Sequence, residues 1–246
     1  MKKVIFALVA ASMTMTSCMN EEFPNATSYG QLNVNVSNDL QMNTRASVAD
    51  LSTWTVKAVG PQTYTLTSKS TNVKAGTYTV SAKSHADEAA ALQDKNGWGA
   101  AYYEGTAAPV EVTAGSKKDV TVECGTAMNA RLKVQFSLIS NFTEYSLTAV
   151  TAPNRNLVFN ASNSNTALAY YGATEVVNYT LSYKYNGTLK EIPGQITMKG
   201  AATENIISIA SNDNGTISVT VNYDDTFGTG NSENLVFDAA TGEKIS

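Results

Sequence analysis

The sequence predicts an all-β protein with two antiparallel β-sandwich domains, and three observations lead to this prediction. Apolar and polar residues alternate over most of the chain, which is typical of strands with one buried face. The residues between these segments are rich in Gly, Asn, Ser and Thr, which favour turns. Only residues 84–97 are rich in helix-forming residues, and Asn96 and Gly97 limit that helix to two or three turns.

The first half of the chain contains four alternating segments, which begin near residues 31, 54, 76 and 117. In each segment one face is apolar and the other carries Asn, Thr, Ser, Lys or acidic residues. The predicted inward residues are Leu32, Val34 and Val36; Trp54, Val56 and Ala58; Tyr78, Val80 and Ala82; and Val120, Val122 and Cys124.

The second half continues the alternation in three further segments. The predicted inward residues are Leu132, Val134, Phe136 and Leu138; Val177, Tyr179, Leu181, Tyr183 and Tyr185; and Ile217, Val219, Val221 and Tyr223. Asn186-Gly187 predicts a hairpin with a type I′ turn. In that register Ile192 opposes Leu181, which fits, but Leu189 opposes Lys184 on the polar face, which does not.

The N-terminus has the three parts of a secretory signal: Lys2 and Lys3, the apolar run 4–11, and small residues ending at Ser17. Small residues before Cys18 resemble a bacterial lipoprotein signal, in which the cysteine is acylated and holds the protein on a membrane. An ordinary soluble secretory signal is the alternative. We expect a signal peptide over 1–17, a tether over 18–28, and domains over 29–125 and 126–246.

Composition excludes several partners and chemistries. The formal charge is −4, and loss of Lys2 and Lys3 makes it −6, so binding to nucleic acid is not expected. With Cys18 acylated, Cys124 has no disulfide partner and is expected to be a small buried apolar residue. The single histidine, His85, lies in a polar stretch without a nucleophile motif, so we predict no enzyme activity.

Two acidic stretches, 211–216 and 222–234, contain oxygen ligands but lack the spacing of an EF-hand loop. We interpret the first as a turn and predict no metal site and no cofactor. A glycosidase with two distant carboxylates stays open at this point.

The stretch "NGWGAAYYEG" is the main candidate for ligand contact. As a strand it would place Trp98 and Tyr102 on one face and Tyr103 on the other, and an exposed aromatic ring could stack on a sugar or anchor a protein partner. Glycine on both sides of Trp98 favours a loop instead, and core packing at a domain junction is the simpler interpretation.

The order of these motifs resembles that of a Bacteroidales family of surface lipoproteins of fimbrillin-like or accessory type. The resemblance rests on Gly76-x-Tyr78-x-Val80, Tyr102-Tyr103-x-Gly105, Val110-x-Val112-x-x-Gly115 and the strand that ends at Cys124. It implies two sandwich domains of transthyretin-like or immunoglobulin-like type, displayed outside the cell. It also implies that Glu21 and Glu22, close behind Cys18, act as a signal for export to the outer face of the outer membrane.

These observations favour a non-enzymatic adhesion or binding module, anchored to the outer membrane at Cys18, with a protein or glycan partner. A sharper version is a fimbrial subunit, because proteolysis between Arg45 and Ala46 would remove the first strand and open a groove for a strand from another subunit. A plain exposed loop at Arg45 is the alternative. The competing function is a glycan-binding lipoprotein of a nutrient-uptake system, with Trp98 or Tyr103 exposed.

Overall fold

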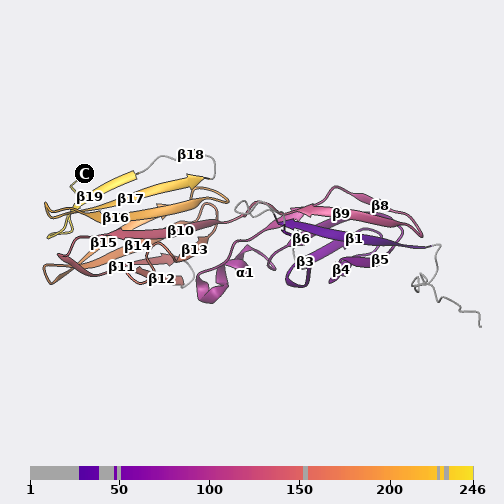
Figure 1. Ribbon diagram of the computed structural model, residues 1–246, viewed down its shortest axis with the longest axis horizontal. Helices are drawn as coiled ribbons and strands as arrows, with labels where there is room; N and C mark the ends of the chain where they lie inside the picture. The colour runs from indigo at the N-terminus through magenta and orange to yellow at the C-terminus, as the bar shows by residue number, and fades with distance from the viewer. Residues whose placement is uncertain are drawn as a thin grey trace, which may run out of the picture.

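The chain folds into two β-sandwiches that lie end to end (Figure 1). The computed structural model describes residues 28–38, 47–48, 51–151, 155–225, 228–229 and 233–245. The buried apolar residues form two clusters, one running from Leu32 to Cys124 and the other from Ala130 to Ala239. We call the elements around these clusters the first sandwich (β1 to β9) and the second sandwich (β10 to β19). The all-β fold predicted from the alternating pattern is confirmed.

In the first sandwich, one sheet is organised around its first strand. β1 (Tyr29–Asn38) lies between β5 (Ser70–Lys74) and β9 (Lys117–Glu123), and β2 (Ser47–Val48) pairs with its end. The facing sheet has the order β4 (Tyr64–Leu66), β3 (Thr55–Val59), β6 (Gly76–Lys83) and β7 (Glu104–Thr106), and β8 (Val110–Val112) also pairs with β6. A 3-10 turn, η1 (Leu51–Thr53), precedes β3.

The second sandwich repeats this plan with additional strands. One sheet has the order β13 (Leu168–Tyr171), β10 (Ala130–Ser137), β16 (Glu204–Ser211), β17 (Thr216–Asp225) and β18 (Gly228–Thr229), and β19 (Glu233–Asp238) also pairs with β17. The facing sheet has the order β12 (Arg155–Asn160), β11 (Phe142–Thr151), β14 (Val176–Tyr185) and β15 (Thr188–Thr197).

Within the described residues each sandwich contains one parallel strand pair, whereas the alternating pattern predicted antiparallel sandwiches. β1 runs parallel to β9, and β10 runs parallel to β16. In both cases the first strand of the sandwich pairs with a strand formed much later in the chain. The two sandwiches differ beyond that pair, because β17 covers the outer edge of β16, whereas in the described residues no strand covers the outer edge of β9.

The predicted inward residues occupy the two cores. Most of them are fully buried, and the exceptions are partly buried side chains that still pack against a core: Trp54, Phe136, Leu138, Tyr185 and Tyr223. The tyrosines of β14 are core residues rather than a binding surface. Alternation therefore identified which face of each strand is buried.

The β14–β15 hairpin has the predicted turn and register. Asn186 and Gly187 have φ angles of 49° and 81°, as a type I′ turn requires at both central positions. Leu181 opposes Ile192, and Leu189 opposes Lys184, so the apparent misfit is real. Leu189 stays 57% exposed. A single exposed leucine on an edge strand is tolerated because it disturbs no buried contact.

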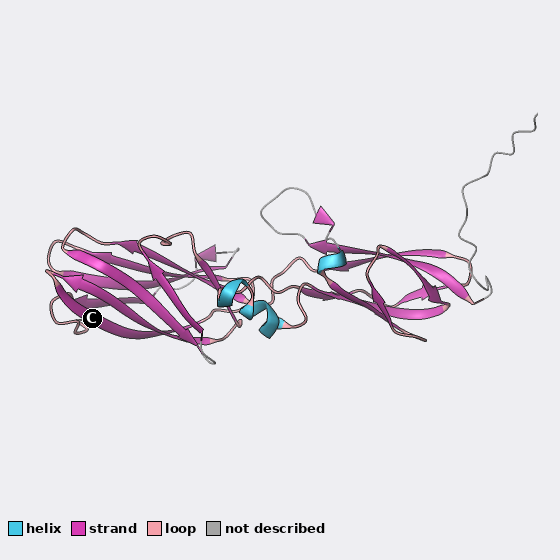
Figure 2. Cartoon of the chain, turned by 90° about the horizontal axis from the view of Figure 1, so that it is seen from below, coloured by secondary structure: helices cyan, strands magenta, loops and turns pink. Residues whose placement is uncertain are grey.

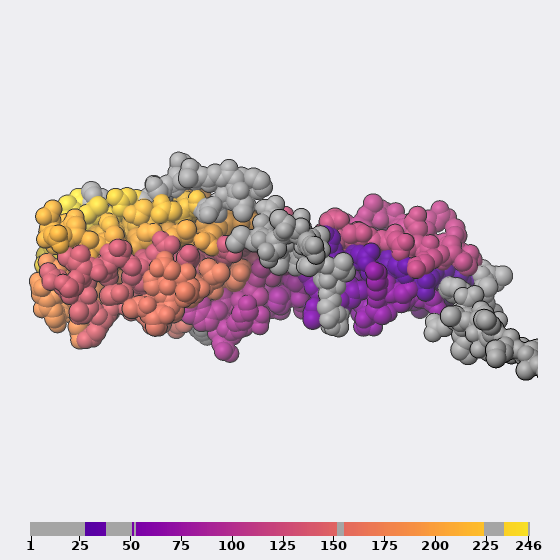
Figure 3. Space-filling view, in the orientation of Figure 1, coloured from indigo at the N-terminus to yellow at the C-terminus, as the bar shows by residue number. Residues whose placement is uncertain are grey.

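The predicted helix is present in the connection between β6 and β7. α1 (Glu88–Gln93) begins at Asp87, whose carboxylate accepts a 2.8 Å hydrogen bond from the amide of Ala90, and η2 (Lys95–Gly97) follows it. This connection, residues 84–103, lies where the two sandwiches meet (Figure 2). The space-filling view shows the first half and the second half of the chain at opposite ends of an elongated molecule (Figure 3).

Candidate functional site at the junction of the sandwiches

The aromatic residues predicted to contact a ligand all lie in the connection 84–103. Residues 98–103 have no regular structure, so the loop favoured by the glycines on either side of Trp98 is present and the strand alternative is wrong. Gly97 and Gly99 have φ angles of 86° and 79°, which a strand does not allow. Since the two glycines turn the chain on either side of Trp98, the three rings do not follow the alternation of a strand.

Trp98 packs against the second sandwich. Its ring is half-buried against the second core, with its centroid 5.1 Å from that of Phe159 and the two planes at 82°. This is the edge-to-face geometry that aromatic pairs favour. The carbonyl of Trp98 also accepts a 2.8 Å hydrogen bond from the amide of Tyr170, on β13.

Tyr102 and Tyr103 belong to different surroundings. Tyr102 is 5% exposed, and its hydroxyl donates a 2.6 Å hydrogen bond to Glu104, which also pairs with Lys83 at 3.3 Å. The hydrogen bond from Tyr102 is the main cause that lowers the pKa of Glu104, while burial raises the pKa of Tyr102. Tyr103 packs against the first core, with its ring 6.4 Å from that of Trp54.

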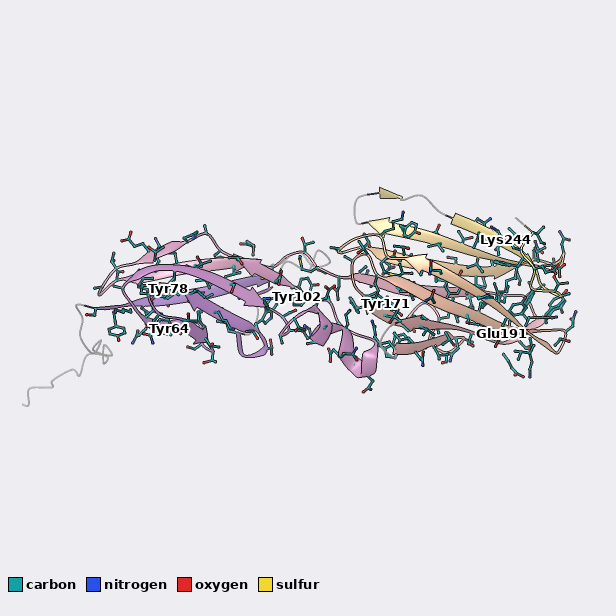
Figure 4. All side chains as sticks on the ribbon, turned by 180° about the vertical axis from the view of Figure 1, so that it is seen from behind. Tyr64, Tyr78, Tyr102, Tyr171, Glu191 and Lys244 are labelled. Carbon is teal, nitrogen blue, oxygen red and sulfur yellow. The ribbon has the colours of Figure 1, made fainter. Side chains whose placement is uncertain are left out.

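The three rings therefore form no common platform. Trp98 faces the second core and Tyr103 the first, while Tyr102 lies buried near the junction, as does Tyr171 of the second sandwich (Figure 4). The arrangement agrees with packing at a junction. A contact of these residues with a glycan or a protein stays a prediction.

An arginine that the sequence analysis did not single out is central to the junction. Arg155 is 6% exposed, and its Nε and Nη2 donate hydrogen bonds of 2.9 and 2.7 Å to the carbonyl of Gly97. Nη2 also donates a 2.7 Å bond to the carbonyl of Tyr170, and the guanidinium lies 4.6 Å from the ring centroid of Tyr171. A signal was present in the sequence, because Arg155 occupies the inward phase of a strand with Leu157 and Phe159.

A buried asparagine joins the same region to the connector between the sandwiches, residues 124–129. Asn129 is 1% exposed; its Oδ1 accepts a 3.0 Å bond from the amide of Tyr102, and its Nδ2 donates a 2.9 Å bond to the carbonyl of Ala100. The amide of Met128 donates to the carbonyl of Tyr102 at 2.7 Å. The single chain crossing and the connection 84–103 are thus held together by directed hydrogen bonds.

The second candidate feature is the first strand. Leu32, Val34 and Val36 of β1 are at most 1% exposed. On the opposite face Asn33 donates a 2.7 Å bond to Asp119 of β9 and accepts a 2.6 Å bond from Ser70 of β5. β1 is therefore bound on both edges and by side chains. The predicted cleavage residues Arg45 and Ala46 lie outside the described residues, as do Cys18, Glu21 and Glu22.

The remaining candidate groups lie in the first core, in the connection 84–103 and in a turn of the second sandwich. Cys124 is 1% exposed, and burial raises the pKa of its thiol to about 11. His85 is half-buried in the connection 84–103, with Nδ1 3.0 Å from the hydroxyl of Ser84 and Nε2 3.8 Å from a carboxylate oxygen of Asp94. Asn212 closes the turn after β16, because its Oδ1 accepts hydrogen bonds from the amides of Asn214 and Thr216, as expected for this stretch.

Across the described ranges, no three His, Cys, Asp or Glu side chains come together closely enough to hold a metal ion. In that same part of the chain, none of the helices has the length and apolar character that crossing a membrane requires.

The chain belongs to a family defined by a domain of unknown function, DUF4493, whose model matches residues 26–239. No curated protein sequence matches it. Three solved structures that resemble it come from Bacteroidales: a fimbrial assembly protein from Parabacteroides distasonis, and the fimbrial anchor protein Mfa2 and the tip fimbrial protein Mfa3 from Porphyromonas gingivalis.

The fimbrial assembly protein is 10% identical, with a TM-score of 0.45 over 84% of this chain and 98% of that one. Mfa2 is 13% identical, with a TM-score of 0.40 over 79% and 96%. Mfa3 is 9% identical, with a TM-score of 0.38 over 80% and 99%.

Proposed function

We propose that the chain is a lipid-anchored cell-surface protein that acts without catalysis, as an adhesion module that joins a fimbrial assembly. The observation that carries the proposal is the position of β1, which is a central strand of its sheet and is also the first strand of the residues that the structure describes. A single cut between β1 and β2 therefore separates β1 from all the elements that follow it in the described part of the chain.

Removal of β1 would open a slot of defined chemistry. The slot would lie between β5 and β9, and both of these strands would have unpaired backbone groups along it. The space vacated by the buried side chains of Leu32, Val34 and Val36 would be lined by the apolar residues of the first core. Burial of three such side chains is worth about 5–9 kcal/mol. A strand from another subunit with apolar residues at alternate positions would regain that energy and the main-chain hydrogen bonds. In this proposal cleavage between Arg45 and Ala46 releases β1 together with the anchor at Cys18, so the lipid holds the uncut protein and the assembly holds the cut subunit.

The other parts of the proposal concern the ends of the chain. We propose that acylated Cys18 holds the protein on the outer membrane, that Glu21 and Glu22 direct it to the cell surface, and that residues 18–28 form the tether. Each sandwich would be a domain, with the boundary near residue 125, because the two buried clusters separate between Cys124 and Ala130.

The anchor is tested by mass spectrometry of the N-terminus of the protein from producing cells, with and without protease shaving of intact cells. We expect an acylated Cys18 on a chain that shaving removes. A Cys18→Ala variant that remained in the membrane fraction would contradict the anchor.

The strand-release step is tested on purified mature chain treated with trypsin. We expect a cut after Arg45, a new N-terminus at Ala46 and a ladder of polymers on a native gel. The Arg45→Ala variant, which lacks this site, should stay monomeric under the same treatment. Efficient cutting at Arg45 without any change in size would refute assembly through this slot.

A further inference from the structure

A comparison of the two sandwiches isolates one segment that has no counterpart. In the second sandwich β14 is joined to β15 by the two-residue turn at Asn186 and Gly187. The equivalent connection of the first sandwich, from β6 to the strands that pair with it, contains residues 84–103. A hairpin of this kind needs only a few residues. The connection 84–103 is therefore longer than closing the first sandwich requires.

These residues make their tertiary contacts with the second sandwich as well as the first. The carbonyl of Trp98 accepts from the amide of Tyr170, which is a main-chain bond to the edge strand β13. A Cβ on Gly99 would lie 3.0 Å from the Cβ of Tyr170, so the two backbones approach closely. The ring of Trp98 also packs edge-to-face against the ring of Phe159 in the second core.

Arg155 supplies the strongest part of this contact. No carboxylate of the described residues lies within 4.0 Å of its guanidinium, so the buried charge depends on the carbonyls of Gly97 and Tyr170 and on the ring of Tyr171. A buried charge is expensive to leave without hydrogen bonds. Separation of the segment from β12 and β13 would remove both bonds from Arg155 to Gly97 and the bond from Tyr170 to Trp98, so the second sandwich holds the segment in place.

We propose that residues 84–103 are a strap that locks the two sandwiches into one stiff rod, and that Arg155 is the positioning residue of this lock. Two domains joined by a short linker normally move relative to each other unless their interface is extensive. Here Arg155 of the second sandwich donates hydrogen bonds to the strap at Gly97. Asn129 of the connector accepts a hydrogen bond from Tyr102 of the strap and donates one to Ala100. The inference does not depend on the proposed function.

The test measures the distance between the sandwiches by double electron–electron resonance on the mature chain with Cys18→Ser. Spin labels are attached at Thr79→Cys on β6 and Thr197→Cys on β15, which are exposed positions on different sandwiches. The native thiol of Cys124 is 1% exposed and escapes labelling. We expect a single narrow distance distribution for this parent protein.

Arg155→Ala should widen the distribution about twofold, since free relative motion is the default for linked domains. Arg155→Lys keeps the charge, but a single ammonium group cannot replace the planar guanidinium, which donates to the carbonyls of both Gly97 and Tyr170. This variant should therefore widen the distribution as well. The matched control is Lys184→Ala, which also removes a cation from the second sandwich; its ion pair with Glu144, at 2.6 Å, does not touch the strap, and its distribution should equal that of the parent.

Loss of Arg155 could unfold the second sandwich, so a variant on the strap itself is included. Trp98→Ala removes the contact with Phe159 without changing any residue of the second sandwich, and it should also widen the distribution. Circular dichroism identifies which variants are folded. A parent distribution as broad as that of the variants, or an unchanged width in every folded strap variant, overturns the proposal.

Discussion

Two buried tyrosines of the second core should respond in opposite directions to loss of the hydroxyl group. Tyr171 and Tyr183 are both 0% exposed. The hydroxyl of Tyr183 donates to the carbonyl of Ala239 at 3.2 Å, whereas the buried hydroxyl of Tyr171 has no hydrogen-bond partner among the described residues. We predict that Tyr171→Phe stabilises the second sandwich and that Tyr183→Phe destabilises it.

The magnitudes follow from the two environments. A buried hydroxyl without a partner costs about 1–3 kcal/mol, so Tyr171→Phe should gain about 1 kcal/mol after allowance for imperfect packing. The guanidinium of Arg155 keeps an aromatic face beneath it, because phenylalanine has the same ring. Tyr183→Phe loses a buried bond and leaves the carbonyl of Ala239 short of a donor, so it should cost about 1–2 kcal/mol.

The assay is urea unfolding followed by tryptophan fluorescence. The chain has two tryptophans, and Trp98 packs against the second core, so a Trp54→Phe background leaves one reporter of the second sandwich. A difference of 1 kcal/mol corresponds to a shift of about 2–4 °C in Tm for a chain of this size, which gives an independent check. If Tyr171→Phe lost as much stability as Tyr183→Phe, the hydroxyl of Tyr171 would have a bound partner and the reasoning would fail.

Three further predictions concern the cores. Cys124 should resist thiol reagents in the native protein at neutral pH and react on unfolding, because its buried thiol has a pKa of about 11; rapid native labelling would contradict its burial. Gly105→Ala should cost the first sandwich about 1–3 kcal/mol in urea unfolding, since a Cβ would overlap the carbonyl oxygen of Glu123; an unchanged midpoint would show that the strands can separate there. Burial raises the pKa of Tyr78 and of Tyr183 to about 12. The contribution of these two phenols to stability should be complete below pH about 10 and should fall as the pH rises toward 12, because the unfolded phenol ionises near 10; a Tm that stays constant over this range would refute it.

The sequence predicted the buried faces of the strands because successive side chains of a strand point to opposite sides, so a strand with one buried face has an apolar residue at every second position. That rule needs no knowledge of which strand pairs with which. Pairing order is a different matter: the parallel pairs of β1 with β9 and of β10 with β16 join residues far apart in the chain, and alternation carries no information about partners. The hairpin at Asn186 and Gly187 was predictable because its turn chemistry is local.

The junction was harder to predict for a physical reason. Gly97 and Gly99 interrupt the strand pattern, so the alternation on either side could not be extended through Trp98. The contact of Arg155 with the carbonyl of Gly97 joins two segments that no local rule connects. The only sign in the sequence was that Arg155, at the start of β12, falls on the same side of the strand as Leu157 and Phe159, where a charged residue needs a polar partner.

The composition of β9 differs from that of β16 in the way expected for a strand edge that no strand of the described residues covers. Four of its residues are charged, namely Lys117, Lys118, Asp119 and Glu123, whereas β16, whose edge is covered by β17, carries one charge, at Glu204. Charged side chains on an exposed edge discourage pairing with other chains. The difference explains why two strands at equivalent positions have unlike sequences.

The parallel pairing of β1 also determines when the first sandwich can form during biosynthesis. The hydrogen bond between Asn33 and Asp119 spans 86 positions in the chain. A ribosome or a secretion channel that releases the chain from its N-terminus therefore delivers Leu32, Val34 and Val36 well before the strand that completes their sheet. Until Lys117–Glu123 has emerged, β1 lacks its parallel neighbour, and completing the sheet then requires a contact between distant parts of the chain, which forms more slowly than local structure.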